Sequence, residues 1–511
     1  MTSTGEAKSS SATETIRGLD RLAPESSDDD TVTDIELAQP AIITPDGVQT
    51  TEDVDWENEP ENPQNWSAWK KTLQVVMLSS TALQASIGTS IMSSAHSDLM
   101  QEFSVSSTAA LLPLTLYVLG LGLGPVLGGP LSETIGRYPI YAGSMPLGAV
   151  FAVGAGFSHR FGALCFCRFM SGLCWGPVLA VASGSLTETF RPKRRGTVSA
   201  VFILMPFLGP GLGPVIGSIL VNRHGWRSTQ WALALLSVFC MVTVALTEET
   251  FRPAIMRRIL KQRSGRIDRS PHWKVRVKEL VFVSVVRPLR MLVVEPIVLF
   301  LCLYVSAEFG TLFSFFAAVP YTFGMVYHFD IEQSGLVFAS IIIGCCLGLF
   351  TIILCDLLIY RKQAARYALN KTPPEHRLYS AMIGSFGPPV ALFWFGWTAR
   401  EDISWSSPAA SIVLFSWGNL CIYVSAIVYI SETYPGSLVA SAISANTLAR
   451  YGFAAAFPLF ALPMYKTLGI DWASGLLGFI ALALLPVPWV LFRYGPQIRA
   501  RSQYETVQYG K

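Results

Sequence analysis

LLPLTLYVLGLGLGPVLGGP, residues 111–130, is an uncharged run of twenty residues, the length that an α-helix needs to cross the hydrocarbon core of a bilayer. It lies in an apolar stretch at 107–130, and eleven further stretches resemble it. These lie near 72–94, 139–158, 161–187, 196–220 and 227–248 in the first half, and near 293–320, 331–359, 378–398, 407–432, 438–463 and 471–493 in the second. We therefore predict an all-α membrane protein with twelve transmembrane helices in two six-helix bundles, which could rock around a shared central cavity.

The composition agrees with this prediction, since 51% of the residues are hydrophobic and only 14% are charged. Such a chain cannot be a soluble protein of ordinary make-up. The spans divide it into an N-terminal tail, a first bundle, a central loop, a second bundle and a C-terminal tail. Their expected bounds are 1–66, 67–248, 249–292, 293–493 and 494–511.

Charge is distributed unevenly along the chain. Residues 1–66 hold sixteen acidic residues against three basic ones, so we expect an acidic, disordered tail. The central loop is basic, but it has no aromatic platform for nucleic-acid bases. We therefore expect it to be a linker beside anionic lipid and expect no nucleic-acid partner.

The orientation follows from Lys and Arg, which accumulate in cytosolic loops. On the predicted boundaries, 31 of them lie on the side of both termini and the central loop, and five lie on the other side. This places both termini in the cytosol. We expect a monomeric, multi-pass protein of the plasma membrane.

The residues needed for catalysis or metal binding are not grouped in this sequence. All six histidines lie in or beside predicted loops, and no pair has the spacing of metal ligands. No Gly-rich phosphate loop ends in Lys-Ser or Lys-Thr. We expect no enzyme activity, no catalytic residue, no metal and no cofactor, and an ion gradient as the energy source of any active transport.

The loop between the second and third spans reads GPLSETIGRYP, residues 129–139, and resembles the signature loop of the major facilitator superfamily. Gly129, Glu133, Gly136 and Arg137 match that pattern, while Tyr138 stands where a second basic residue is usual. A carboxylate and a guanidinium on a short turn can pair with each other or with a neighbouring helix end and so latch one of two states. The alternative is an ordinary charged turn that fixes topology.

The fourth and fifth spans continue this resemblance. Arg168 lies inside the fourth span, where a guanidinium costs about 2.5 to 3.5 kcal/mol on insertion scales, so it should face a wet cavity or a buried partner. The resemblance implies a role in proton coupling; a structural hydrogen bond to backbone carbonyls is the alternative. GPGLGPVIGS, residues 209–218, is similar to the motif of the superfamily's antiporters, with glycines every four residues on one helix face. The implied gate consists of Gly209, Pro210, Gly213, Pro214 and Gly217.

Segments before the first span and in the second half indicate one branch of the family. ENPQNWS at 61–67, YISETYP at 429–435, ANTLARY at 445–451 and the segment at 494–501 resemble fungal twelve-span drug:proton antiporters. The resemblance implies the major facilitator fold and a multidrug or secondary-metabolite efflux carrier.

Glu308 is an isolated carboxyl near the middle of the seventh span and matches no family motif. Such a group could gain and lose a proton as access alternates. Arg168 or Arg450 could instead hold it as a static ion pair between the two halves. We assign proton coupling to Arg168, Glu308 and Arg450.

The substrate cavity should be lined by spans one, four, seven and ten, with Gln84, Tyr117, Phe315 and Asn419 as lining residues. The predicted function is the proton-coupled export of a drug, toxin or secondary metabolite, with a small molecule, protons and lipid as partners. Two alternatives stay open. One is a carrier of the same fold that takes up or redistributes a polyamine, an organic acid or a vitamin, and the other is a receptor or scaffold that transports nothing.

Overall fold

The computed structural model describes residues 42–44, 47–49, 56–264, 285–367 and 372–507. The chain forms two units, Met1–Asp53 and Val54–Lys511. In the first, strands β1 (Ile42–Thr44) and β2 (Gly47–Gln49) pair antiparallel. Their β-branched residues flank a Pro-Asp-Gly sequence, which favours a turn. This hairpin departs from the disordered tail predicted at 1–66; the remainder of residues 1–55 lies outside the described residues.

The end of the predicted tail is also ordered. The side chain of Asn62 is buried, donates to the Trp56 carbonyl at 2.9 Å and accepts the Gln64 N–H at 3.0 Å. It caps a 3-10 turn at Pro63–Asn65, and Ser67 then caps the first long helix. Residues 56–66, which the prediction placed in the disordered tail, are therefore ordered.

The first half of the second unit consists of helices joined by short turns and loops in its described part. Its helices are α2 (Ala68–Ile87), α3 (His96–Phe103), α4 (Leu112–Ile135), α5 (Arg137–Gly156), α6 (Phe161–Thr189), α7 (Pro192–His224), α8 (Arg227–Ala245) and α9 (Arg252–Ser264), with 3-10 turns η4 (Ser93–Ala95) and η5 (Ala109–Leu111).

The second half of this unit also consists of helices joined by turns and loops in its described part. Its helices are α11 (Arg287–Val294), α12 (Pro296–Tyr327), α13 (Ile331–Leu336), α14 (Ala339–Cys355), α15 (Arg361–Ala364), α16 (Tyr379–Gly384), α17 (Gly387–Thr398), α18 (Ser406–Thr433), α19 (Gly436–Leu484) and α20 (Val487–Arg499). A π-helical turn at Asp356–Tyr360 joins α14 to α15, and a 3-10 turn at Pro374–Arg377 precedes α16.

Nine segments of the described residues are long and apolar enough to cross a membrane. They cover ten of the predicted spans, because 438–463 and 471–493 fall in one segment, Leu438–Arg499. Within this segment Gly469 has a φ of 82°, which turns the chain between the two spans at a residue without a Cβ. The many-helix architecture is confirmed, and the number of crossings stays a prediction.

The two remaining spans differ from the prediction in their bounds. The span predicted at 72–94 ends early, at Ile87, where Thr89 hydrogen-bonds the Ser86 carbonyl at 2.6 Å and helps to form a turn. The span predicted at 378–398 is broken between α16 and α17. Pro388 and Pro389 have no N–H to bond the carbonyls of residues 384 and 385, which favours a break in the helix there.

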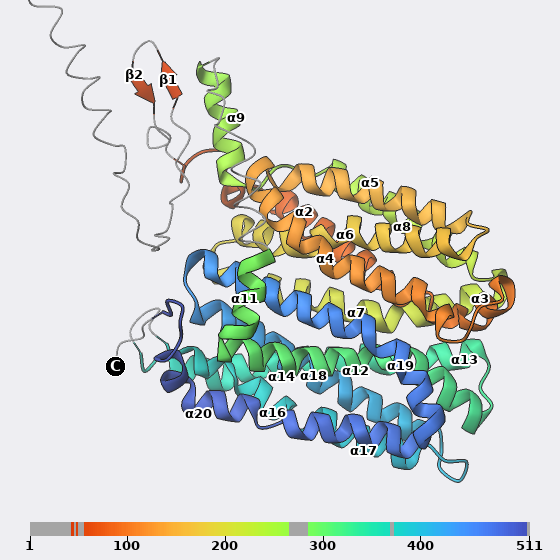
Figure 1. Cartoon of the computed structure of the whole chain (residues 1–511). Coiled ribbons are helices and arrows are strands. Elements are labelled where there is room, and N and C mark those ends of the chain that lie inside the picture. Colours follow the sequence, from red (N-terminus) through yellow and green to blue (C-terminus); the bar gives the residue numbers. More distant parts are fainter. Residues whose placement is uncertain (1–41, 45–46, 50–55, 265–284, 368–371, 508–511) are drawn as a thin grey trace, which may run out of the picture. The chain divides into compact units, whose positions relative to one another are not determined.

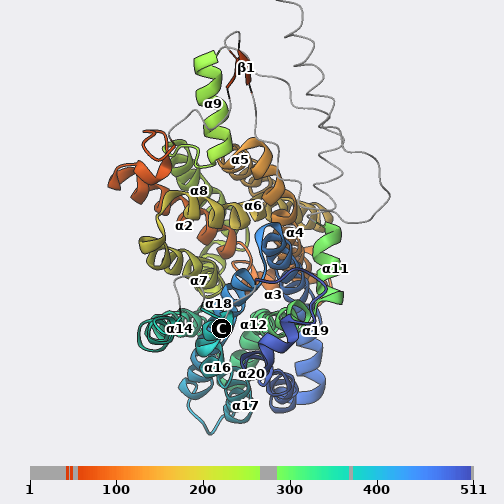
Figure 2. The same cartoon turned by 90° about the vertical axis from the view of Figure 1, so that its left-hand side faces the viewer.

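The long helices pack in two groups (Figure 1, Figure 2). The N-terminal group comprises α2 and α4 to α8, and the C-terminal group comprises α12, α14 and α16 to α20. Two seams join the groups: α4 packs on α19, and α7 packs on α13 and α14. Figure 1 shows α3 and α13 at one end of the helices, called the α3/α13 end, and α11 at the other, called the α11 end.

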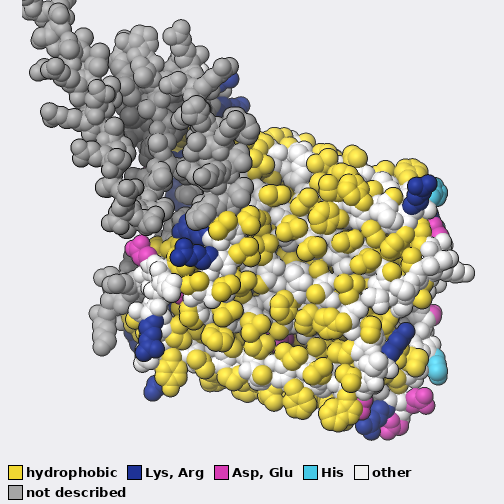
Figure 3. All heavy atoms as spheres, in the orientation of Figure 1, with side chains coloured by type: hydrophobic (Ala, Val, Ile, Leu, Met, Phe, Trp, Pro, Cys, Tyr) yellow, Lys and Arg dark blue, Asp and Glu magenta, His cyan; other side chains and the backbone are white. Residues whose placement is uncertain are grey.

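The side of the molecule shown in Figure 3 is covered by hydrophobic side chains between two ends at which charged side chains gather. Large apolar side chains such as Leu235 and Val293 are 73% and 76% exposed. Exposed apolar surface of this extent is typical of helices that face lipid.

Candidate functional site

The turn between α4 and α5 lies at the α11 end and is held by two carboxylates from other segments. The Arg137 guanidinium pairs with Glu188, at the end of α6, with 3.1 Å between Nη2 and Oε1. Glu249, just beyond α8, accepts the backbone N–H groups of Arg137 at 2.8 Å and of Tyr138 at 3.1 Å. A carboxylate at a helix N-terminus is favoured by the unpaired N–H groups and by the helix dipole.

Within the predicted latch, Glu133 and Arg137 do not pair with each other. Glu133 is exposed and forms no ion pair with Arg137 within the described residues, and nothing lies within 4 Å of a Cβ built on Gly129. Gly136 has a φ of 105°, and a Cβ there would lie 2.3 Å from the Glu249 carboxylate. Gly136 is therefore required by both its backbone conformation and its contact. Of the two pairings left open, the one with a neighbouring helix end is present.

Arg168 of α6 is completely buried, and its side chain bonds the turn after α2 and the start of α4. Its Nη2 donates to the Gly88 carbonyl at 2.6 Å, and its Nε donates to the Pro113 carbonyl at 3.3 Å. The guanidinium lies 4.2 Å from the ring centroid of Tyr117, and Nη1 has no hydrogen-bond partner. These contacts match the structural alternative for Arg168, and its role in proton coupling stays a prediction.

The glycines of α7 face the end of α2 and the turn that follows it. A Cβ on Gly209 would lie 2.3 Å from Ser86 Oγ, one on Gly213 2.0 Å from Ser90 Oγ, and one on Gly217 2.2 Å from the Ile91 carbonyl oxygen. The backbones of α2 and α7 therefore approach as closely as the repeated glycines allow.

One proline of α7, Pro210, leaves a carbonyl group free that a side chain of α2 satisfies. Pro210 has no N–H to bond the Pro206 carbonyl, and the Ser86 hydroxyl donates to that carbonyl instead. Pro214 and Ser218 lie on the other side of α7, where both contact the Cβ position of Gly335 in α13. The predicted gate segment thus contacts both groups of helices.

Glu308 is 3% exposed in α12, and its Oε2 has no hydrogen-bond partner. It forms no ion pair with Arg168 or Arg450 within the described residues. The alternative of a static Glu308–Arg pair between the halves is therefore wrong for this conformation.

Arg450 lies in α19 at the contact between the two groups and is 6% exposed. Its guanidinium carbon lies 4.4 Å from the ring centroid of Phe309, 4.7 Å from that of Tyr423 and 4.5 Å from that of Tyr451. Phe207 of the N-terminal group contacts the rings of Phe309 and Tyr423, with centroids 6.2 and 4.8 Å apart. We call these four aromatic residues and Arg450 the Arg450 cage.

The four predicted cavity residues are buried, and no contact joins any two of them directly among the hydrogen bonds and ring contacts of the described residues. Gln84 donates to Ser237 of α8 at 2.7 Å, and Tyr117 donates to the Ala85 carbonyl at 2.8 Å. Phe315 packs its ring on Phe395 and Phe415 inside the C-terminal group. Only Gln84 and Asn419 have unpaired polar atoms, Oε1 and Nδ2.

The two groups are closed against each other at the α3/α13 end. Asn222 of α7 donates to Glu332 of α13 at 3.2 Å. An apolar cluster from η5, α12 and α19, called the apolar plug, also joins the groups: Leu111, Ala317, Ala461 and Leu462, with Leu459 and Tyr321 packed against it.

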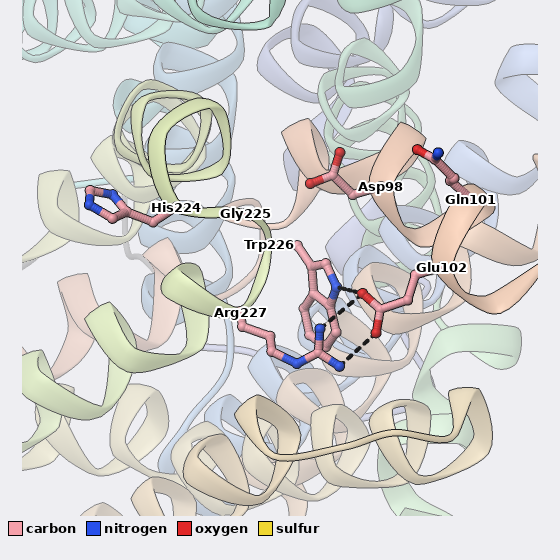
Figure 4. Close-up of a pocket in the computed structure, with 7 residues that line it drawn as sticks. All are labelled: Asp98, Gln101, Glu102, His224, Gly225, Trp226 and Arg227. Carbon is pink, nitrogen blue, oxygen red and sulfur yellow. Dashed lines mark hydrogen bonds and ion pairs between the residues drawn. The ribbon is translucent and has the colours of Figure 1, made fainter.

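A pocket of about 330 Å³ opens at the α3/α13 end (Figure 4). Arg227 binds both carboxylate oxygens of Glu102, at 2.6 and 2.9 Å, and Trp226 donates to the same group at 2.7 Å. The hydrogen bond from Arg227 holds the pKa of Glu102 below its usual 4.5, whereas burial raises the pKa of Asp98. This charged pocket was not predicted from the sequence.

Other contacts that form the site were also missed. Glu249 follows the sixth span in a TEET sequence that we did not single out, although an acid just beyond a span end is a recognisable signal. Phe309 and Tyr423 carry no such signal, because aromatic residues are common in apolar helices.

Residues 77–458 match the family described as the Major Facilitator Superfamily. Polyamine transporter 4 of Saccharomyces cerevisiae is 34% identical over 483 residues, which cover 88% of this chain and 73% of that protein. The Ascochitine biosynthesis cluster MFS transporter of Didymella fabae is 34% identical over 457 residues, 87% of each protein. Fluconazole resistance protein 1 of Saccharomyces cerevisiae is 34% identical over 475 residues, which cover 88% of this chain and 84% of that protein.

The fold has a counterpart among solved structures. A POT family transporter crystallised with 5-aminolevulinic acid superposes with a TM-score of 0.60 at 13% identity, over 84% of this chain and 97% of that one. At this identity the likeness concerns the fold alone.

Proposed function

Since this chain belongs to the Major Facilitator Superfamily, a family of transporters rather than enzymes, we propose that it exports a small organic molecule in exchange for protons by alternating access. The closure of the two helix groups at the α3/α13 end, by the Asn222–Glu332 hydrogen bond and the apolar plug, is the observation that carries this proposal. Two groups that meet along two seams can exchange one closed end for the other.

The proposed topology has twelve crossings in two six-helix bundles, with both termini in the cytosol. The excess of Lys and Arg on the α11 side of the chain supports this orientation. The α3/α13 end then faces outward, and the conformation described is closed to the outside. We propose a monomer in the plasma membrane.

The latch is proposed to act at the cytosolic, α11 end. Arg137, Glu188 and Glu249 tie α4, α5, α6 and the segment after α8 together, so the N-terminal group can move as one body. The α7 glycines are proposed to form the antiporter gate, because that helix contacts α2 on one side and α13 on the other.

Glu308 is proposed to carry the proton. Burial without a cation partner makes the neutral form of a carboxyl lower in free energy than the charged form. Glu308 can therefore accept a proton from one side and release it when water reaches it from the other. Arg168, buried inside the N-terminal group, and Arg450, at the contact between the groups, complete the proposed coupling set through their positive charges.

The names of the relatives bear on the cargo. They include a fluconazole resistance protein and a transporter of a biosynthesis cluster, which favour export of a drug or secondary metabolite. A polyamine transporter is among them too, so uptake or redistribution of a metabolite is the outcome to be tested against export.

The test has two parts. Untargeted mass spectrometry of cells with and without the gene should find at least one organic compound retained inside the cells that lack it. Inverted vesicles that contain the protein should then accumulate that compound when their interior is made acidic, and a protonophore should stop the accumulation. Net movement of the compound into intact cells, driven by inward proton flow, would establish the uptake alternative instead.

A further inference from the structure

The Arg450 cage is a positive charge enclosed by aromatic faces. Three ring centroids lie within 4.7 Å of the guanidinium carbon, and only 6% of the residue is exposed. Each face attracts a cation through its quadrupole, which helps to hold the guanidinium in the apolar core.

Among the residues that the structure describes, no carboxylate balances the charge of Arg450. No carboxylate oxygen of the described residues lies within 4.0 Å of a guanidinium nitrogen, and Nε has no hydrogen-bond partner. Glu308 precedes Phe309 of the cage, but its carboxyl forms no ion pair with Arg450. A buried arginine is normally paired, and it retains five N–H groups that suit a planar anion.

The cage also lies where transport requires movement. Phe207 belongs to α7 in the N-terminal group, whereas Phe309, Tyr423 and Tyr451 belong to helices of the C-terminal group. When the groups separate, the ring contacts of Phe207 must open, which would expose the guanidinium and the ring faces together.

We propose that the Arg450 cage is the binding site for the acidic group of a planar aromatic cargo, a carboxylate or phenolate. This inference rests on the proposed transport function and adds the chemical class of its substrate. The guanidinium fork would bind the two oxygens of a carboxylate, and the rings of Phe309 and Tyr423 would stack on the cargo's ring. A polyamine is disfavoured there because it would bring like charge beside Arg450.

An anion bound to Arg450 would cancel the charge that this residue places between the groups. Cargo binding would thereby change the electrostatic surroundings in which Glu308 exchanges its proton, which links the cage to the coupling set.

The experiment compares two xanthene dyes of similar shape and opposite charge, fluorescein and rhodamine 6G. Fluorescence anisotropy of each dye is measured against the purified full chain in detergent. Fluorescein should bind, and Arg450→Gln should weaken its binding at least tenfold, whereas Arg450→Lys should weaken it less. Arg160→Gln, an exposed arginine, is the matched control and should bind fluorescein like the unaltered chain.

Three results would overturn the inference: no fluorescein binding by the unaltered chain, a preference for rhodamine 6G, or an Arg450→Gln affinity equal to that of Arg160→Gln. If Arg450→Gln elutes as an aggregate in gel filtration, Phe309→Leu and Tyr423→Leu replace it. Each keeps the charge and should lower the fluorescein affinity several-fold, and unchanged affinity in both would overturn the inference.

A parallel transport measurement separates this inference from the proposed function. Pumping of rhodamine 6G but not fluorescein into acid-loaded inverted vesicles would retain the exporter and reject the anion site. Fluorescein binding that depends on Arg450, without proton-driven transport of any compound, would retain the site and reject the exporter.

Discussion

Substituting alanine for a single glycine of α7 tests how closely that helix must approach α2. In Gly217→Ala, the new Cβ would lie 2.2 Å from the Ile91 carbonyl oxygen, far shorter than an ordinary contact of 3.4–4 Å. The obstacle is backbone and cannot rotate away. Overpacking of this kind costs about 1–3 kcal/mol, whereas an unobstructed Gly→Ala change inside a helix gains about 0.5–1 kcal/mol.

Gly143 in α5 supplies the matched control, because nothing lies within 4 Å of its added Cβ. We expect the stabilities of Gly217→Ala and Gly143→Ala to differ by about 1.5–4 kcal/mol, from the two ranges above. Gly217→Ala should melt at a lower temperature than Gly143→Ala in detergent, and its efflux should fall while efflux by Gly143→Ala is kept.

The same seam offers a rescue. The first obstacle at Gly213 is the Ser90 hydroxyl, at 2.0 Å, which Ser90→Ala removes, and the next contacts are at 3.0 and 3.1 Å. Gly213→Ala should therefore lose stability and efflux, and Gly213→Ala with Ser90→Ala should recover part of both. The larger Gly213→Leu should lose transport or uncouple it from protons. If Gly217→Ala melts as high as Gly143→Ala and the double variant recovers nothing, the close contact of α2 with α7 does not limit this protein.

Three further changes test other parts of the molecule. Glu308→Gln should abolish proton-coupled efflux while insertion, judged by the amount of protein in the membrane, stays intact; unchanged efflux at all pH values would remove Glu308 from the mechanism. Glu249→Ala removes the acceptor of the Arg137 and Tyr138 N–H groups and should destabilise the protein by about 1–3 kcal/mol, with Glu249→Gln intermediate; melting temperatures equal to that of the unaltered chain would contradict this. The pKa of Glu102 lies below 4.5, so its pairing with Arg227 should stabilise the protein above pH 4.5, and this stabilisation should be lost as the pH falls through the lowered pKa. The difference in melting temperature between the unaltered chain and Arg227→Gln should thus be constant from pH 7 to about pH 5. A decrease of this difference that begins near pH 6 would be inconsistent with the pair.

The helices of the fold could be predicted because their signal is local. An apolar run of about 20 residues specifies a membrane-crossing helix whatever its neighbours are, and each predicted span contains helix in the structure. The bounds were less accurate where a specific neighbour or residue decides them. The first span ends at Ile87, where the Thr89 hydroxyl bonds the Ser86 carbonyl, and the ninth is interrupted just before Pro388 and Pro389.

The site could be predicted only as far as short motifs reach. The glycine spacing of α7 indicated its close contact, and the loop after α4 indicated its arginine. The partner of the Arg137 backbone is Glu249, more than a hundred residues later in the chain, and no local pattern connects the two. The same holds for the Arg450 cage. Its four rings come from α7, α12, α18 and α19, so only the tertiary structure brings them together.

The apolar plug at the α3/α13 end has a consequence for how transport responds to temperature. Opening that end exposes Leu111, Leu462 and Tyr321 to water, and hydration of apolar surface carries a positive heat capacity. The enthalpy of opening should therefore change with temperature, so a plot of the logarithm of the efflux rate against reciprocal temperature should be curved. Polar substitutions in the plug, such as Leu111→Ser, should straighten it.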